Sequence, residues 1–160
     1  MQKEFEKIKK IFYERNLKIE IIQHEVPKTS EELARTVNYD LKQGIKAIVL
    51  SNGQGEYLVV NIPANEKVNM KKVAEQIGWP KSRIKFALPE EVEIQTGCKI
   101  GEVPPLYHKK KLPILIDKKI YWNKNNFFTP GIVSHTIKIK TETLKDLFKK
   151  VDAIEGEWTK

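Results

Sequence analysis

The sequence predicts an α+β domain built around a mixed β-sheet. Predicted hairpins are interleaved with predicted helices along the chain, an order that favours a mixed sheet over a regular parallel one. The 160 residues are enough for one domain of common size with a single sizeable core. No internal repeat or linker-like tract divides them, so we expect one domain over residues 1–160.

The first part of the chain is predicted to form a helix, a strand and a second helix. Apolar residues recur at helical spacing between charged ones across residues 3–15, which indicates an amphipathic helix. Residues 19–26 are rich in β-branched side chains and predict a strand. Thr29 precedes Glu32 by three positions, the capping-box spacing that opens a helix, and this helix is expected to reach about residue 37.

The middle of the chain predicts a hairpin followed by a helix. Two apolar strands, residues 46–50 and 56–62, flank Asn52-Gly53-Gln54-Gly55, and glycine and asparagine are the residues that tight hairpin turns favour. Residues 68–77 have helical spacing and stop at Gly78, which we expect to cap the C-terminus of this helix because glycine readily adopts the left-handed conformation.

A short strand over residues 83–87 is expected next, and then a short helix that Pro89 opens and Gly97 closes. Further along, residues 114–116 and 119–122 are predicted to pair as a second hairpin.

The last part of the chain predicts an apolar segment around residues 127–128, a strand over 135–140 and a helix from 143 to about 151. The tail through Lys160 carries no strong signal, so we expect it to fray.

The loop Gly101-Glu102-Val103-Pro104-Pro105 precedes an apolar strand and is stiff and poor in donors. Proline fixes φ and lacks an N–H, so only the first three residues can donate from the backbone. Gly101 can also admit another molecule close to the main chain, because it has no Cβ. The loop is therefore either a rigid connection between two elements or a site for a ligand carbonyl or hydroxyl.

The chain carries a formal net charge of +8, and its only arginines are Arg15, Arg35 and Arg83. Such a basic excess can attract nucleic acid through phosphate contacts, although a lysine-rich soluble surface gives the same balance. The triplet Lys109, Lys110 and Lys111 follows the proline loop closely and favours a polyanionic partner.

No run of apolar residues is long enough to span a membrane, and residues 2–4 are polar, so we expect a cytoplasmic protein without a membrane partner. Cys98 is the only cysteine, which excludes an intramolecular disulfide and a cysteine-rich zinc site. His24, His108 and His135 are too scattered for a metal motif, so we expect no metal and no cofactor.

Two polar residues begin strands on their apolar sides. Side chains alternate along a strand, so Lys46 shares a face with Ile48, and His135 shares a face with Ile137. Each has an ordinary explanation, because a lysine can extend its ammonium to water and a histidine can be a satisfied structural residue. Their parallel placement instead favours a pocket mouth, and Gly131 ahead of His135 could admit a ligand close to the backbone.

Several of these segments together resemble the YbaK/EbsC family of aminoacyl-tRNA editing domains, which are related to the insertion domain of bacterial prolyl-tRNA synthetase. The segments that carry the resemblance are residues 46–50, Thr96-Gly97, Gly101 to Pro105, Gly131 followed by His135, and the opening strand and helix at residues 23–26 and 29–34. The match extends over about residues 20–150, nearly the whole chain.

The resemblance implies a barrel-like mixed sheet with surrounding helices, and a free-standing deacylase that hydrolyses the ester of a mischarged tRNA carrying a small amino acid. It implies attack by water, assisted by groups of the substrate. The expected partners are the 3′ aminoacyl end of tRNA, bound in part by Lys109, Lys110 and Lys111, and an aminoacyl-tRNA synthetase.

The resemblance also implies the roles of individual residues. Lys46 would hold the terminal phosphate or the developing charge, the backbone at Gly101 would orient the carbonyl or the attacking water, and His135 would bind the amino group or the ribose. The residues expected to contact the substrate are Thr29, Ser30, Val103 and Gly131.

Three alternatives stay open at this point. The chain could be a non-catalytic module that binds tRNA or a synthetase, or a small-molecule binder unrelated to tRNA. Cys98 could also form a nucleophilic pair with His108 or His135.

Overall fold

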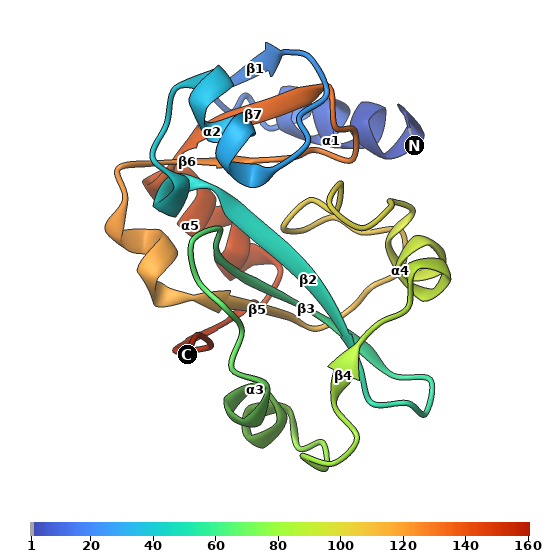
Figure 1. The fold of residues 1–160 in the computed structure, drawn as a ribbon. Coiled ribbons are helices and arrows are strands. Elements are labelled where there is room, and N and C mark those ends of the chain that lie inside the picture. Colours follow the sequence, from blue (N-terminus) through green and yellow to red (C-terminus); the bar gives the residue numbers. More distant parts are fainter. Residues whose placement is uncertain (1) are drawn as a thin grey trace.

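The computed structural model describes residues 2–160, whose backbone forms two β-sheets with helices around them (Figure 1). The strands are β1 (Ile19–Gln23), β2 (Ile45–Ser51), β3 (Tyr57–Pro63), β4 (Lys85–Phe86), β5 (Ile114–Asp117), β6 (Asn125–Phe128), β7 (His135–Lys140) and β8 (Ile154–Gly156). The helices are α1 (Gln2–Glu14), α2 (Ser30–Val37), α3 (Met70–Ile77), α4 (Pro89–Thr96) and α5 (Thr141–Lys150), with 3-10 turns at Leu41–Gln43 and Lys118–Trp122.

The smaller sheet has the order β1-β7-β6 and is antiparallel throughout. The larger sheet has the order β4-β2-β3-β5-β8 and is mixed, because β5 runs parallel to both β3 and β8. The predicted α+β class with a mixed sheet is confirmed. The expectation of a barrel is wrong, because the strands form two separate sheets that do not close on each other.

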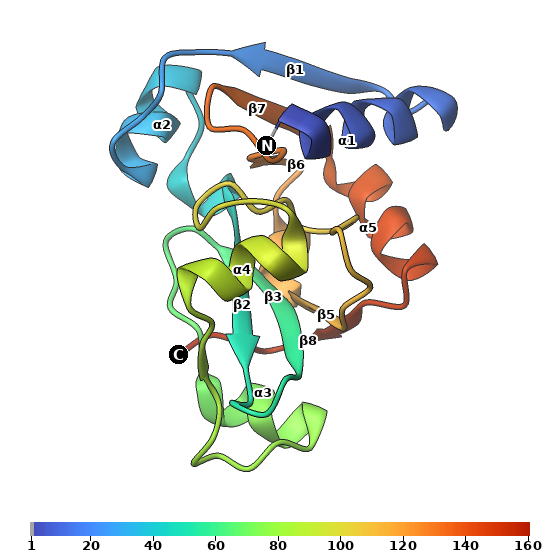
Figure 2. The ribbon, with the colours of Figure 1, turned by 90° about the vertical axis from the view of Figure 1, so that its right-hand side faces the viewer.

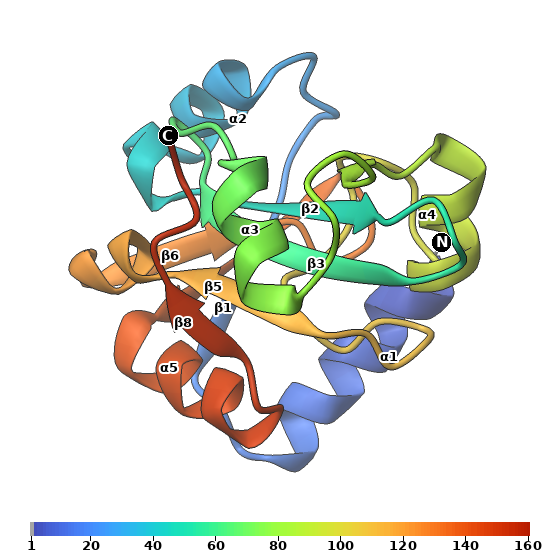
Figure 3. The same ribbon diagram turned by 90° about the horizontal axis from the view of Figure 1, so that it is seen from below.

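Alternation along the strands divides the larger sheet into two apolar faces. One face packs against α3, where Val73 joins Leu50 and Val60 in a buried cluster (Figure 3). The other face packs against α4, where Val92 meets Val49 (Figure 2). These two clusters hold β2 and β3 between layers of helix.

A third and larger cluster lies between the smaller sheet, β5 and the helices α1 and α5. The predicted amphipathic stripe of α1 contributes to it, since Ile8 and Phe12 are each 1% exposed. Ile137 and Ile139 of β7 lie in the same cluster, as the alternation along that strand predicted. None of the helices among residues 2–160 combines the length and the apolar character that a bilayer span requires.

The predicted second hairpin is wrong. Residues 118–122 form a 3-10 turn rather than a strand, because Asp117 caps them by accepting a hydrogen bond from the Lys119 N–H at 2.9 Å. The turn places Ile120 in the core with no exposure, and β5 takes its partners from distant segments instead.

The tail is ordered, contrary to the expected fraying. Residues 154–156 add β8 to the edge of the larger sheet, and the Trp158 N–H donates to Asp117 Oδ2 at 2.8 Å. The Trp158 indole is 5% exposed within the α3 cluster. Pairing with a strand nearly forty residues earlier left no local signal in the sequence.

Replacing Trp158 with alanine is expected to lower the free energy of unfolding by about 3–5 kcal/mol, because it removes a large buried side chain. The matched control is Trp122→Ala, since Trp122 is 72% exposed. Urea unfolding followed by circular dichroism measures both. Equal effects of the two substitutions would contradict the anchoring of the tail.

Candidate functional site

A cavity of about 640 Å³ lies along the first half of β2. Its walls come from the start of α2, the loop after α4, the segment that follows β6 and the connection between β4 and α4. The residues that define these walls include Thr29, Ser30, Leu33, Phe86, Ala87, Val92, Ile100, Gly101, Val103, Phe127, Phe128, Thr129 and Val133, together with residues 45–49 of β2.

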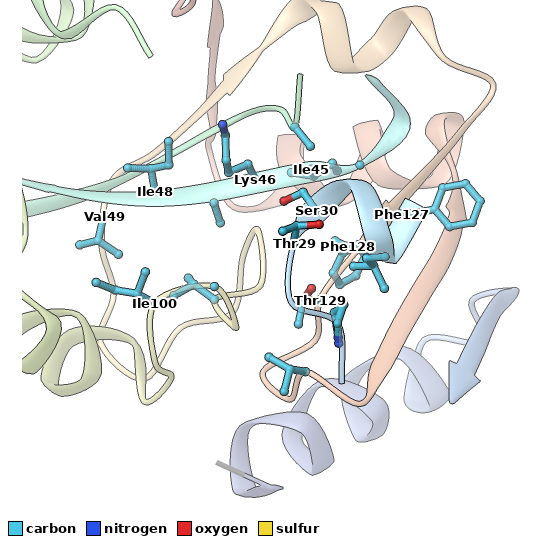
Figure 4. Close-up of a pocket in the computed structure, with 18 of the residues that line it drawn as sticks. Thr29, Ser30, Ile45, Lys46, Ile48, Val49, Ile100, Phe127, Phe128 and Thr129 are labelled. Carbon is cyan, nitrogen blue, oxygen red and sulfur yellow. The ribbon is translucent and has the colours of Figure 1, made fainter. Parts of the chain in front are cut away.

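β2 borders this cavity and projects side chains from both of its faces. Lys46 and Ile48 rise from one side of the strand, whereas Val49 and Ile100 lie on the other (Figure 4). The second side is apolar, because Val49 packs in the same cluster as Val103 and Val92. The cavity therefore combines an apolar floor with a cationic group at the start of β2.

The Lys46 ammonium is partly buried and has one protein partner, the Glu66 carbonyl, to which it donates at 2.9 Å. Burial lowers the pKa of Lys46 from its usual value, while the charge of Glu31 acts in the opposite direction. An ammonium group has three donors, so two remain for a ligand.

Thr29 and Ser30 reach the cavity because they start α2 (Figure 4). Thr29 is the N-cap residue, and its Oγ1 accepts a hydrogen bond from the Glu32 N–H at 3.0 Å, as the predicted capping spacing requires. The cap fixes the Thr29 hydroxyl beside the first residues of β2, where its own O–H can still donate.

The loop that contains Gly101 depends on the left-handed backbone conformation of this glycine. Gly101 has a φ of +89°, and a Cβ built there would meet no atom within 4 Å, so backbone conformation rather than crowding requires the glycine. The Glu102 N–H is used inside the turn, where it donates to the Lys99 carbonyl at 2.9 Å. Within residues 2–160 the Gly101 and Val103 N–H groups have no acceptor, which leaves them as the donors of this wall.

Two side chains hold the loop in place by hydrogen bonds to its proline carbonyls. The Asn61 amide donates to the Pro105 carbonyl at 3.0 Å, and His108 Nε2 lies 2.7 Å from the Pro104 carbonyl. A carbonyl can only accept, so Nε2 of His108 carries the proton. Burial lowers the pKa of His108 to about 4, which keeps the ring neutral at pH 7.

An aminoacyl-tRNA editing domain family matches residues 24–147. The chain belongs to this family. The resemblance to the YbaK/EbsC editing domains is thereby confirmed.

The editing domain is similar to two kinds of curated relative. The multifunctional Ser/Thr-tRNA deacylase ProXp-y of Escherichia coli K12 is 26% identical over 125 residues, which are 76% of this chain and 74% of the relative. The proline–tRNA ligase of Thermosipho melanesiensis is 27% identical over 134 residues, which are 82% of this chain but 23% of the ligase. A solved structure described as a candidate trans-editing enzyme for prolyl tRNA synthetase has the same fold, with a TM-score of 0.83, 20% identity and coverage of 98% and 97% of the two chains.

The editing domain gathers only part of the predicted site into one cavity. The predicted residues that line it are Thr29, Ser30, Lys46, Gly101 and Val103. His135 does not line the cavity, although Val133, two residues earlier, does. The His135 ring packs on Phe5 of α1 at 4.7 Å between ring centroids, and its Nδ1 lies 2.8 Å from Ser134 Oγ.

Gly131 serves packing between α1 and the loop before β7. A Cβ at Gly131 would lie 3.3 Å from Glu4 Cβ and 3.4 Å from Cys98 Sγ, and its φ is +89°. The Gly131 backbone is therefore packed closely against α1 and Cys98.

Lys109, Lys110 and Lys111 are exposed and do not line the cavity. Backbone bonds from Lys109 to the Thr96 carbonyl at 3.2 Å and from Lys110 to the Gln95 carbonyl at 3.0 Å hold the triplet beside the end of α4.

Cys98 is unsuited to nucleophilic attack. Its side chain is fully buried, and burial raises the pKa of the thiol to about 12, so the reactive thiolate is scarce at neutral pH. Among residues 2–160 no three His, Cys, Asp or Glu side chains lie together as ligands for a metal ion.

Sequence reasoning missed the apolar walls of the cavity. Phe86 and Ile100 line it although they are 58% and 60% exposed, and Phe127 stacks on Tyr39 at 4.2 Å between ring centroids. Exposed aromatic and aliphatic side chains have no signal of their own in a single sequence. The paired phenylalanines at 127 and 128 were noted only as an apolar segment.

His108→Gln is expected to flatten the loss of stability on acidification. The pKa of His108 is lowered in the folded protein, so the unfolded chain binds the proton first and the stabilising contribution, complete above about pH 6.5, is lost as pH falls toward 4. The loss is at most about 1.4 kcal/mol per pH unit. Glutamine keeps an amide donor for the Pro104 carbonyl but does not titrate.

Urea unfolding of both proteins at several pH values between 7 and 4.5 measures the difference, because all other titrating groups are shared. Parallel stability curves would contradict the buried neutral state of His108.

Proposed function

We propose that this editing domain removes a small, wrongly attached amino acid from tRNA by hydrolysing its ester bond. The observation that carries the proposal is the cavity itself, which brings Lys46, the Gly101 loop and the capped start of α2 together in a member of the aminoacyl-tRNA editing family. Its volume of about 640 Å³ lies within the range of small-molecule sites.

The reaction needs three things from the site. A water oxygen attacks the ester carbonyl carbon, the negative charge that develops on the carbonyl oxygen is stabilised, and the bond to the ribose oxygen breaks as that oxygen takes up a proton. The products are the free amino acid and uncharged tRNA. In the proposal, a hydroxyl of the terminal ribose guides the water, and no protein nucleophile or metal ion takes part.

Lys46 and the Gly101 loop act on opposite ends of the substrate in this proposal. Lys46 binds the terminal phosphate with the two ammonium protons that the Glu66 carbonyl leaves free. The Gly101 N–H orients the ester carbonyl or the attacking water. His135 lies outside the cavity, so the proposal gives it no contact with the ester.

The apolar floor supports a small amino acid as the substrate. Val49 and Val103 are buried and Ile100 also lines the cavity, so the floor offers an aliphatic surface to a small side chain. A hydrophobic site distinguishes one methylene by only about 1–3 kcal/mol, which is why synthetases that mischarge small amino acids depend on a second hydrolytic site. Alanine, serine, threonine and cysteine are the substrates to compare.

A tRNA charged by prolyl-tRNA synthetase is the first partner to test. The relatives include a proline–tRNA ligase of which this chain matches 23%, and a Ser/Thr-tRNA deacylase. Lys109, Lys110 and Lys111 are proposed to contact the tRNA backbone beside the loop. A cytoplasmic location and a synthetase that delivers the substrate belong to the same proposal.

Incubation with tRNA carrying alanine, serine, threonine or cysteine, in the presence of a metal chelator, is expected to release the amino acid from at least one ester. Lys46→Ala is expected to reduce the rate by about a hundredfold, because it removes the ammonium that is proposed to bind the terminal phosphate and so to position the ester. The measurement is loss of radiolabelled amino acid from the tRNA.

Two outcomes of this panel count against the proposal. Stable esters throughout would favour a module that binds tRNA without turnover. Turnover that stops on chelation would overturn the metal-independent mechanism.

Gly101→Ala is expected to lower turnover by about a hundredfold by displacing the loop N–H, since an error of one ångström in positioning is that costly. The matched control is Gly78→Ala, because Gly78 also has a left-handed φ, +82°, with no neighbour within 4 Å of a built Cβ, and lies away from the cavity at the end of α3. Both should lose about 1–2 kcal/mol of stability from the strained conformation. Equal turnover by the two variants would exclude a role for the Gly101 backbone.

A further inference from the structure

β2 is paired along one edge but only at the ends of the other. β3 pairs with its whole length from Ile45 to Ser51. On the opposite edge, Gly44 forms an isolated bridge with Phe127, and β4 pairs only with Leu50 and Ser51. Within residues 2–160 no strand pairs with the part of this edge that lies between the two contacts.

Hydrogen bonds at the two ends of the hairpin show which backbone groups of β2 face that gap. The Ala64 N–H donates to the Gly44 carbonyl at 2.8 Å, and the Asn52 N–H donates to the Glu56 carbonyl at 3.2 Å. Residues of an antiparallel strand alternate between the two edges, so every even-numbered residue of β2 bonds to β3 and every odd-numbered one points away.

The bond from the Ala87 N–H to the Val49 carbonyl, at 3.0 Å, agrees with this assignment. Ala47 is the odd-numbered residue in the middle of the gap, and it lines the cavity. Its N–H and its C=O therefore face the cavity as an adjacent donor and acceptor. Backbone groups withdrawn from bulk water require partners, and in this gap a ligand can supply them.

We propose that the aminoacyl group of the substrate pairs with Ala47 as a single added residue of the sheet. Its α-amino group donates to the Ala47 carbonyl, and its ester carbonyl accepts from the Ala47 N–H. An aminoacyl ester has the same N–Cα–C=O order as a peptide residue, so it can form both bonds of one antiparallel pair. This inference rests on the proposed function and names how the same cavity recognises its substrate.

The pairing fixes the direction of the substrate. Two bonds to one residue occur in the antiparallel orientation, so the ester end points toward the start of β2 and the amino end toward Val49. The ribose then lies beside Lys46, which is where a phosphate of the terminal nucleotide would meet the ammonium.

The pairing also fixes the side chain of the substrate. Directly paired residues place their side chains on the same face, so the substrate side chain lies beside the Ala47 methyl. That methyl faces the cluster of Val49, Val92 and Val103, whereas Ile48 faces the opposite cluster (Figure 4). The small size of Ala47 therefore leaves the room that the amino acid occupies, and Ala47 sets the size limit.

Ala47→Val is the direct test, with Leu50→Val as the matched control on the opposite face of the same strand, at a residue that does not line the cavity. Turnover is measured with glycyl, alanyl, 2-aminobutyryl and threonyl esters of one tRNA. Ala47→Val should shift kcat/KM in favour of the smaller esters by about tenfold or more per added carbon, whereas Leu50→Val should leave the order of preference unchanged. Ala47→Gly, which removes the methyl group, should shift the preference toward the larger esters. It provides the same test if the valine variant does not fold.

A propionyl ester, which lacks the α-amino group, tests the second bond and should react at least about tenfold more slowly than the alanyl ester. Unchanged preferences in the Ala47 variants, or equal rates for propionyl and alanyl esters, would overturn the pairing while leaving the deacylase intact. Failure of the wild-type protein on every ester would overturn both together.

Discussion

Hydrogen bonds to two consecutive proline carbonyls determine the position of one wall of the cavity. Pro104 and Pro105 are buried and belong to no strand or helix, so their carbonyls need donors from elsewhere. Asn61 supplies one from the middle of β3, with its amide fully buried, and it also donates to the Leu115 carbonyl at 3.2 Å. His108 supplies the other. The loop is thus attached to the interior of the larger sheet through Asn61.

The second determinant is the incomplete pairing of β2. The smaller sheet reaches this strand at Gly44, and β4 reaches it from Leu50 onward, so the two leave a short open stretch between them. Elsewhere such an edge is a liability, because exposed ladder groups invite association with other chains. Here Ile100, Phe86 and the start of α2 line the cavity beside this stretch. The pairing proposed for Ala47 would make this open edge the surface that binds the substrate.

The sequence predicted what local patterns determine. Apolar periodicity located α1, and the glycines after Asn52 located the hairpin of β2 and β3. Thr29 and Gly78 fixed helix ends through caps that need only their neighbours.

The predictions that were wrong concern residues whose structure depends on partners distant in the sequence. Residues 119–122 look like a strand, but the Asp117 cap and the pairing of β5 with β3 and β8 make them a turn. Lys46 and His135 occupy similar places in their own strands, yet Lys46 lines the cavity, whereas the His135 ring packs on Phe5 of α1, a segment distant in the sequence. The loop, Lys46 and the start of α2 were found because their residue types are unusual, whereas Ala47 and Ile100 are ordinary and gained importance only from their surroundings.

The parallel order β3-β5-β8 has a consequence for how the chain matures during synthesis. β2, β3 and the residues around the cavity emerge from the ribosome long before residues 154–156, yet β5 lacks its outer neighbour and the α3 cluster lacks Trp158 until those residues arrive. Contacts between such distant segments form slowly. The hairpin of β2 and β3 can therefore form before β8 is available to cover the outer edge of β5.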